Sequence, residues 1–178
     1  GRMDLLVAEM AATTHEKDQR TMASSRSLLA VDPPDNAIVA PQYFRNVGGG
    51  RFRELKGSSS PGKFFDGKYL GRGLARLDWN RDGKEDFSVS HIGSPAALVV
   101  NRTAGAGHFL ALQFRGVIGD RDAIGTTVRV TAGKRTVTSQ LMAGDGYQAT
   151  NERRLIFGLG EAMHIEKVVV RWPSGIEQ

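Results

Sequence analysis

The 178-residue sequence contains no cysteine. This absence excludes disulfide bridges, thiolate metal sites and a cysteine nucleophile. There is also no uninterrupted run of about 18 apolar residues, the length that a membrane-spanning helix needs. Glycine is plentiful, yet no Gly-x-x-x-x-Gly-Lys-Ser/Thr segment occurs, so a phosphate-binding loop has no support. The sequence therefore predicts no membrane span and none of these common reactive sites.

Histidine is scarce, and the four residues present are far apart: His15, His91, His108 and His164. None of them has a partner at the spacing of a helical zinc site, so a histidine-based metal centre is not expected. Ser174 follows a predicted strand, but no Gly-x-Ser-x-Gly elbow surrounds it. The histidines and Ser174 therefore supply no catalytic residue that we would assign.

The chain is basic, with a net charge of +5 and a pI near 9.8. Such a balance raises the question of nucleic-acid binding. The lysines and arginines are scattered, however, and no basic stripe interleaved with aromatic residues is present. A solvated basic surface is the preferred interpretation, and a nucleic-acid partner is the weaker alternative.

The most informative segment is residues 78–86, which read Asp-Trp-Asn-Arg-Asp-Gly-Lys-Glu-Asp. Ca²⁺ takes six to eight oxygen ligands, and a turn whose alternate side chains carry oxygen can supply them. Carboxylates packed in one turn also repel one another unless a cation lies among them. The spacing predicts a calcium loop whose ligands are the side chains of Asp78, Asn80, Asp82 and Asp86 and the carbonyl of Lys84.

This loop is not an EF-hand, because its twelfth position is Val89 instead of a bidentate Glu. The following residues, 87–90, alternate between apolar and polar, so the loop is predicted to join two β-strands. Gly83 suits the sharp bend, where a positive φ would disfavour a residue with a Cβ atom. The alternative is an Asp/Asn/Gly-rich turn that binds no metal.

The start of the chain resembles the second half of this loop. Residues 1–8 align with residues 83–90, glycine on glycine and aspartate on aspartate. Internal repeats are typical of propellers and solenoids, so we expect a second, truncated loop and hence a fragment of a larger protein. The alternatives to a repeat are coincidence over a short match or a cloning remnant at Gly1 and Arg2.

The first part of the chain is predicted to be β-strands separated by loops. Residues 10–40 are interpreted as a long surface excursion with room for a short helix. Residues 47–50 lie between aromatic strands and predict a glycine hairpin turn. Residues 103–107 are the predicted domain boundary. The expected strands are 5–9, 42–46, 51–55, 70–77, 86–92 and 96–101, with a loop at 56–63.

From His108 onward, five short strands alternate between apolar and polar residues and are separated by turn chemistry. Many short, evenly spaced, alternating strands favour a β-sandwich or a barrel. We expect the inward aliphatic positions to form its core. These positions, with the aromatic residues that share the pattern, are Leu110, Leu112, Phe114, Val128, Val130, Val137, Leu141, Leu155, Phe157, Leu159, Val168, Val170 and Trp172.

Two segments of the first part resemble FG-GAP/VCBS repeats, the blades of integrin-like β-propellers. Residues 77–87 are similar to the calcium loop of those repeats, and residues 43–52 look like their glycine hairpin. Gly49 stands where the hairpin usually carries Asp, so no metal is assigned there. The resemblance implies that residues 1–106 are the C-terminal repeat or repeats of a propeller.

The second part resembles the ASPIC/UnbV domain through four motifs in order: Asp120–Gly125, Gly144–Tyr147, Phe157–Gly160 and Val170–Gly175. That domain follows propeller repeats in cartilage acidic protein and in many bacterial exported proteins. The implied architecture is all-β, a propeller fragment followed by a small β-sandwich at 107–178. The resemblance implies a non-enzymatic, calcium-stabilised module for adhesion or ligand binding, at the cell surface, in the periplasm or outside the cell. The partner would be an unidentified extracellular protein or glycan.

Several alternatives stay open. Asp122 and Asp145 form a possible carboxylate pair for a polysaccharide hydrolase or lyase, or the chain serves as a glycan-binding accessory domain of an exported enzyme. With Asp120 they could instead hold a second cation, although a structural role with Arg121 as salt-bridge partner is preferred. Open sheet edges on partial blades also invite self-association. Asn101-Arg102-Thr103 is a glycosylation sequon that matters only in a eukaryotic secretory route.

Overall fold

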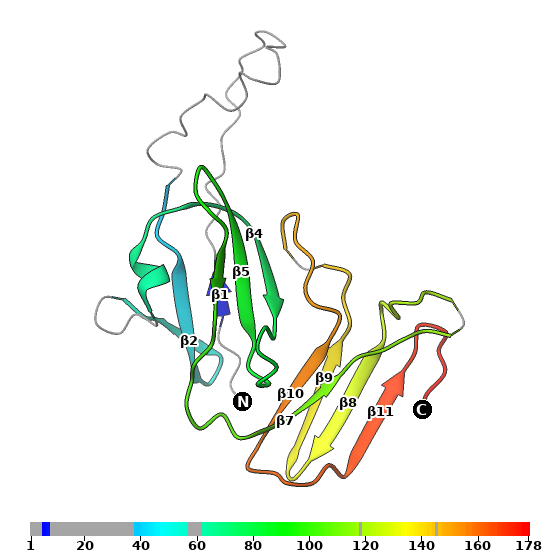
Figure 1. The fold of residues 1–178 in the computed structure, drawn as a ribbon. Helices are drawn as coiled ribbons and strands as arrows, with labels where there is room; N and C mark the ends of the chain where they lie inside the picture. Colours follow the sequence, from blue (N-terminus) through cyan, green and yellow to red (C-terminus); the bar gives the residue numbers. More distant parts are fainter. Residues whose placement is uncertain (1–4, 8–37, 57–61, 118, 145) are drawn as a thin grey trace. The chain divides into compact units, whose positions relative to one another are not determined.

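The computed structural model describes residues 5–7, 38–56, 62–117, 119–144 and 146–178. Within these ranges the protein is built from β-strands, and its only helical element is a single 3₁₀ turn, η3 (Lys63–Asp66) (Figure 1). The all-β prediction is therefore confirmed. The strands are β1 (Leu5–Val7), β2 (Gln42–Gly48), β3 (Arg51–Glu54), β4 (Leu70–Leu77), β5 (Asp86–Ile92), β6 (Ala97–Val99), β7 (His108–Leu112), β8 (Thr127–Ala132), β9 (Arg135–Gln140), β10 (Leu155–Gly160) and β11 (Lys167–Arg171).

The chain forms two compact units. One comprises Gly73–Val89 and Ala97–Gln178, and the other comprises Arg2–Arg72 and Ser90–Ala96. A compact unit of this kind need not coincide with a domain that folds by itself. The boundary at 106/107 stays a prediction, as does the propeller assignment of the first part.

In the unit of Arg2–Arg72, strands β1, β2 and β3 form one antiparallel sheet. The β2–β3 hairpin turns at Gly49 and Gly50, whose φ angles are 61° and 71°. Two consecutive positive φ angles match the twist of a tight hairpin, which only glycine adopts at little cost. Asn46 braces the turn, because its Oδ1 accepts the N–H of Gly48 at 2.9 Å. The predicted glycine hairpin is confirmed.

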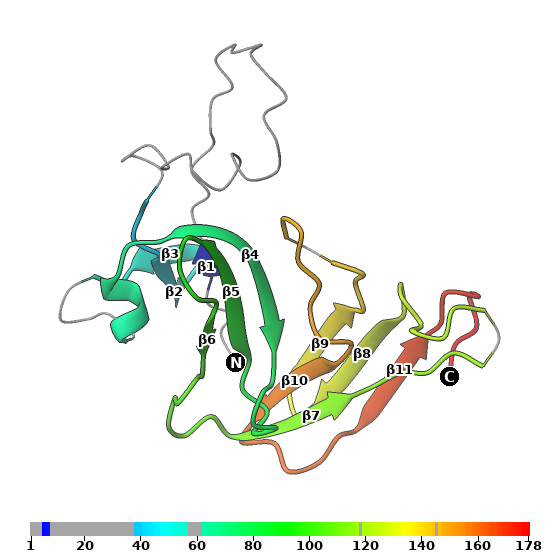
Figure 2. The same ribbon diagram turned by 45° about the horizontal axis from the view of Figure 1, so that its top comes forward.

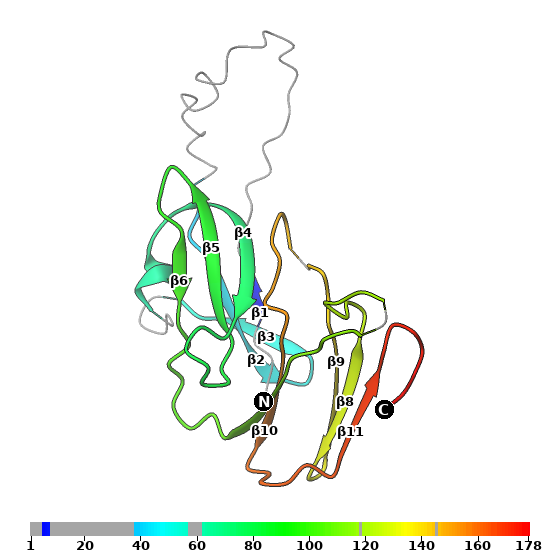
Figure 3. The ribbon, with the colours of Figure 1, turned by 45° about the vertical axis from the view of Figure 1, so that its right-hand side comes forward.

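Strands β4, β5 and β6 form a second sheet, in that order, shown side by side in Figures 2 and 3. Strand β5 pairs with β6 antiparallel over Phe87–Val89. The bounds of β4 and β5 coincide with the predicted strands 70–77 and 86–92. The intervening residues, 78–85, contain no regular secondary structure. The 78–86 segment therefore joins two strands, as its sequence predicts.

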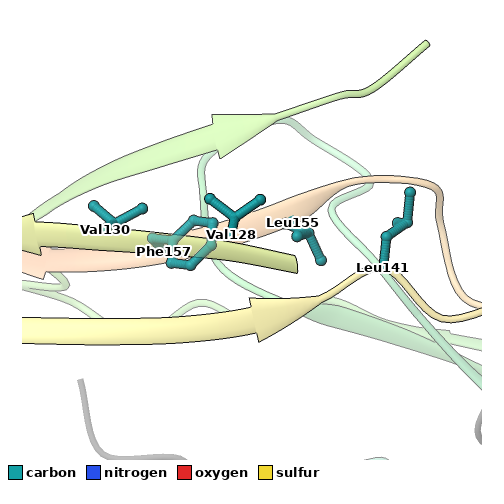
Figure 4. Close-up of a cluster of buried hydrophobic side chains, with 5 residues drawn as sticks. All are labelled: Val128, Val130, Leu141, Leu155 and Phe157. Atoms are coloured by element: carbon teal, nitrogen blue, oxygen red, sulfur yellow. The ribbon is translucent and has the colours of Figure 1, made fainter. Parts of the chain in front are cut away.

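The C-terminal strands form a two-stranded sheet, β10–β7, and a three-stranded sheet, β11–β8–β9, both antiparallel. Figure 4 shows their buried core, a cluster of side chains from β8, β10 and the residue that follows β9. The cluster consists of Val128, Val130, Leu141, Leu155 and Phe157. Eight half-buried side chains pack against it: Leu110, Leu112, Phe114, Ile124, Val137, Leu159, Val168 and Val170.

This core agrees with the alternating pattern in the sequence. Only Ile124 was not among the expected positions, and it lies in the loop that precedes β8. Trp172 is also part of the pattern, and its ring meets that of Phe114 edge to face with centroids 5.8 Å apart. No helix in the described ranges is long and apolar enough to cross a membrane.

Candidate metal centre

Asp78 and Asp86 are the two buried carboxylates of the loop between β4 and β5. Their exposed fractions are 0% and 1%. Asp78 opens the loop, and its Oδ1 and Oδ2 accept the N–H groups of Asp82 and Gly83, each at 3.0 Å. The loop backbone therefore folds around the side chain of its own first residue.

Asp86 closes the loop in the same manner. Its Oδ2 accepts the N–H of Trp79 at 2.9 Å, and its Oδ1 accepts the N–H of Asn101 at 2.7 Å. The first contact joins the two ends of the loop. The second ties the loop to the segment after β6, where Asn101 also caps a short turn by accepting the N–H and hydroxyl of Thr103.

The remaining predicted ligands are less buried: Asn80 is exposed, and Asp82 and Lys84 are half-buried. Asn80 and Asp82 hydrogen-bond through the Asn80 amide and Asp82 Oδ2, at 3.0 Å. The Lys84 ammonium lies 3.0 Å from that same oxygen and also donates to the carbonyl of Thr103 at 3.3 Å. The Lys84 ammonium therefore balances the charge of the Asp82 carboxylate.

The donor set suits a hard cation in its chemistry, since it consists only of carboxylate, amide and backbone oxygens. Buried charges normally require a partner of opposite sign. Among the described residues, the ion pairs near the loop involve Asp82, Glu85 and Glu152, and none reaches Asp78 or Asp86. Within the described ranges, each of these two carboxylates is held by backbone amides alone, and each oxygen keeps a lone pair that a cation could use.

The side chains are not gathered around one point, however. In the described parts of the chain, no three His, Cys, Asp or Glu side chains lie together as a metal-binding group. Asp82 faces Lys84 instead of the two buried carboxylates. A cation shared by all four predicted side chains would therefore have to displace the ammonium and draw Asp82 inward.

Gly83 is the turning point of the loop, with a φ of 78°. A Cβ atom at this position would lie 2.2 Å from the ring of Phe109, so only glycine fits against strand β7. Arg81 also has a positive φ, 62°, which is uncommon for a residue with a side chain. The predicted need for a left-handed glycine is confirmed, while the contact with Phe109 was not foreseeable from spacing.

Glu152 is a site residue that the sequence pattern missed. Its Oε2 accepts the N–H of Asp78 at 3.0 Å, and its Oε1 pairs with the guanidinium of Arg81. Arg154 Nε lies 3.6 Å from that oxygen. The first and fourth loop residues are thus fixed by one carboxylate 74 positions away from Asp78. No local signal marks Glu152, since it precedes β10 among other charged residues.

Two carboxyl groups near the loop have lowered pKa values. Burial works against ionisation of Glu152, but hydrogen bonds from Asp78 N–H and Arg81, with the positive charges of Arg81 and Arg154, outweigh it and lower its pKa. At Asp82 desolvation also opposes ionisation, and hydrogen bonds from Lys84 and Asn80 lower the pKa overall. Both carboxyl groups are therefore ionised at neutral pH.

Asp120 and Asp122, the alternative carboxylates, lie in the turn before β8. Asp120 accepts the N–H groups of Asp122 and Ile124 at 3.2 and 3.3 Å, which is a turn-forming role. Asp122 lies 3.6 Å from Nε of Arg153, whose guanidinium also donates to the carbonyls of Met142 and Ala143. The basic partner seen here is thus Arg153, whereas the sequence suggested Arg121. Asp145 lies outside the described residues.

Comparison with known families places one part of the chain. Residues 116–178 match the family described as ASPIC and UnbV. The match begins after β7 and covers the loop that carries Asp120 and the strands β8 to β11. It includes Glu152 but not the 78–86 loop. A comparison with curated proteins found no match.

Proposed function

We propose that the chain is a non-enzymatic, calcium-binding module that serves adhesion or ligand binding at the cell surface, in the periplasm or outside the cell. Two features support the proposal. Residues 116–178 match the ASPIC and UnbV family, and residues 77–87 resemble the calcium loop of the FG-GAP/VCBS repeats that precede this domain in cartilage acidic protein and in bacterial exported proteins. The metal has a structural role and catalyses nothing.

The observation that carries the calcium assignment is the burial of Asp78 and Asp86 without a basic partner among the described residues. Calcium would provide the missing positive charge. Asp78, Asn80, Asp82 and Asp86 would bind it by side chain and Lys84 by its carbonyl. When bound, the ion neutralises the loop and fixes its shape, while the backbone amides already hold the two buried carboxylates in place.

The loop also presents a side chain suited to ligand contact. Trp79, between two predicted ligands, is 64% exposed. An exposed tryptophan has a large apolar face and an indole N–H, and it gives much contact energy at interfaces. A protein or glycan ligand that meets the loop would therefore bind best when the loop geometry is fixed. Asp122, in contrast, is engaged by Arg153, and this contact adds nothing to the hydrolase or lyase alternative.

Thermal unfolding with calcium and with a chelator tests the proposal. An extracellular-type site binds calcium with a dissociation constant of about 10⁻⁴–10⁻³ M. At millimolar calcium it would stabilise the fold by about 0.4–1.4 kcal/mol, which corresponds to a few degrees in Tm. Asp82→Ala should abolish the difference, whereas Asp122→Ala, in the other acidic turn, should leave it intact. Equal melting of the unmodified protein in both conditions would refute the calcium assignment.

A further inference from the structure

The 78–86 loop is held from outside by the segment 151–154, which lies in the part of the chain that matches the ASPIC and UnbV family. The backbone N–H of Glu152 donates to the carbonyl of Arg76 at 2.9 Å. The N–H of Arg76 in turn donates to Oδ1 of Asn151, also at 2.9 Å. These two bonds fix the end of β4 immediately before the loop begins.

The side chain of Glu152 extends this attachment into the loop. It accepts the N–H of Asp78 and pairs with Arg81, so it restrains both the entry and the exposed middle of the loop. Arg81 has a φ of 62°, a conformation that persists only where its surroundings hold it. At a second point of the loop, Gly83 lies against Phe109 with no room for a Cβ atom. The loop is therefore in contact both with β7 and with the residues before β10.

From these contacts we propose that Glu152 is a positioning residue for the cation loop, which couples the order of residues 78–86 to the C-terminal module. The proposal rests on the calcium function proposed above but adds a residue and a mechanism to it. If Glu152 orders the loop, then its removal must lower the affinity of the loop for calcium. Calcium must in turn strengthen the attachment of the loop to residues 151–154, since coupling between two sites is reciprocal.

Calorimetric titration of the full chain with CaCl₂ measures the coupling. Glu152→Ala should weaken calcium binding about five-fold or more, the usual lower end of coupling between sites. Glu152→Gln keeps an oxygen that can accept the N–H of Asp78 and should restore part of the affinity. An unchanged affinity in both variants would overturn the proposal.

Two control variants separate positioning from simpler effects. Glu85→Gln removes a negative charge from within the loop, where Glu85 pairs with Arg76 at 3.1 Å. Glu166→Gln alters another glutamate that accepts a backbone N–H, that of Gly133 at 2.9 Å, away from the loop. Both should retain most of the affinity. A loss in Glu85→Gln as large as that in Glu152→Ala would assign the effect to charge and overturn the proposal.

Hydrogen exchange in chelator tests the attachment without any metal. Glu152→Ala should speed exchange of the hydrogen-bonded amides of Asp78, Asp82 and Gly83, while the amides of β8 stay protected. Faster loop exchange in a protein that binds no calcium would refute the calcium function yet support the role of Glu152. Unchanged loop exchange would refute the role of Glu152, whatever the calcium affinity.

Discussion

The loop of residues 78–86 and the turn of residues 120–125 use similar residues for different purposes. Each contains an aspartate whose two carboxylate oxygens accept two backbone N–H groups, Asp86 in one and Asp120 in the other. Asp86 is almost completely buried and forms no ion pair with a described basic residue, whereas Asp120 is exposed. Its neighbour Asp122 has Arg153 as a partner.

The difference shows that the number of carboxylates in a turn does not define a cation site. An exposed carboxylate keeps its water and is stable with or without a cation. A buried one loses that water and needs compensation from hydrogen bonds and charge. Burial therefore makes the 78–86 loop a metal candidate and leaves the 120–125 turn a structural element, although both read as acidic turns in the sequence.

Replacing Asp86 and Asp120, one at a time, should give the largest difference between the two turns in the free energy of unfolding. Asp86→Ala removes the acceptor of Trp79 N–H and Asn101 N–H in a buried setting, so we expect a loss of about 2–6 kcal/mol. Asp120→Ala frees two amides that water can reach and should cost about 0.5–1 kcal/mol. Urea unfolding in chelator measures both. Similar losses would show that burial does not separate the two turns.

Replacing a glycine in or beside each turn should give a somewhat smaller difference in the free energy of unfolding. Gly83→Ala combines an unfavourable φ of 78° with a Cβ atom 2.2 Å from Phe109, so we expect a cost of about 2–4 kcal/mol. Gly119, just before the second turn, also has a positive φ, 93°, but has open space around it. Gly119→Ala should therefore cost about 1 kcal/mol. Unfolding midpoints that fall equally would contradict the close packing of Gly83.

Removing the basic partners should separate the turns by calcium affinity. Lys84→Met removes the ammonium that pairs with Asp82 but keeps the backbone carbonyl, so calcium should bind up to about five-fold more tightly, the upper worth of an ion pair near the surface. Arg153→Met removes the partner of Asp122 and should leave the affinity unchanged. Calorimetric titration with CaCl₂ measures both. Weaker binding by Lys84→Met would argue against the assigned ligands.

The smallest effect is expected in the pH dependence of stability. Glu152 and Asp82 have pKa values below their ordinary values of 4.5 and 3.8. A carboxyl group with a lowered pKa stabilises the folded state above its unfolded pKa, and this contribution is lost as pH falls through the lowered folded pKa. Between about pH 5 and pH 3, Glu152→Gln should therefore lose less stability than the unmodified protein. Identical pH profiles from urea unfolding would contradict the contacts of Glu152.

Much of the local structure was predictable from the sequence. The bounds of β4 and β5 follow from alternating residues on either side of an Asp/Gly-rich run. The glycine hairpin at residues 48–50 and the positive φ of Gly83 follow from the conformational freedom of glycine. The five buried residues of the C-terminal core were all expected, because alternation with period two places them on one face of each strand.

Long-range pairing was not predictable in the same manner. Arg121 is adjacent to Asp120 and Asp122 in sequence, yet Arg153 is the residue that pairs with Asp122. No sequence pattern around Glu152 marks it as a partner of Asp78, and none around Phe109 marks it as the side chain that packs against Gly83. Such contacts depend on which strands pack together, and a single sequence does not encode that in any local pattern.

The sequence by itself determined the kinds of elements in this protein: short strands, glycine turns, and a loop rich in oxygen ligands. These depend on each residue's own φ preferences, side-chain chemistry and spacing, which act over a few positions. Only the tertiary structure decided which carboxylates are buried, which basic side chains they pair with, and that Glu152 contacts the loop. Burial and pairing result from packing between distant segments, and the electrostatic cost of a carboxylate depends on that environment.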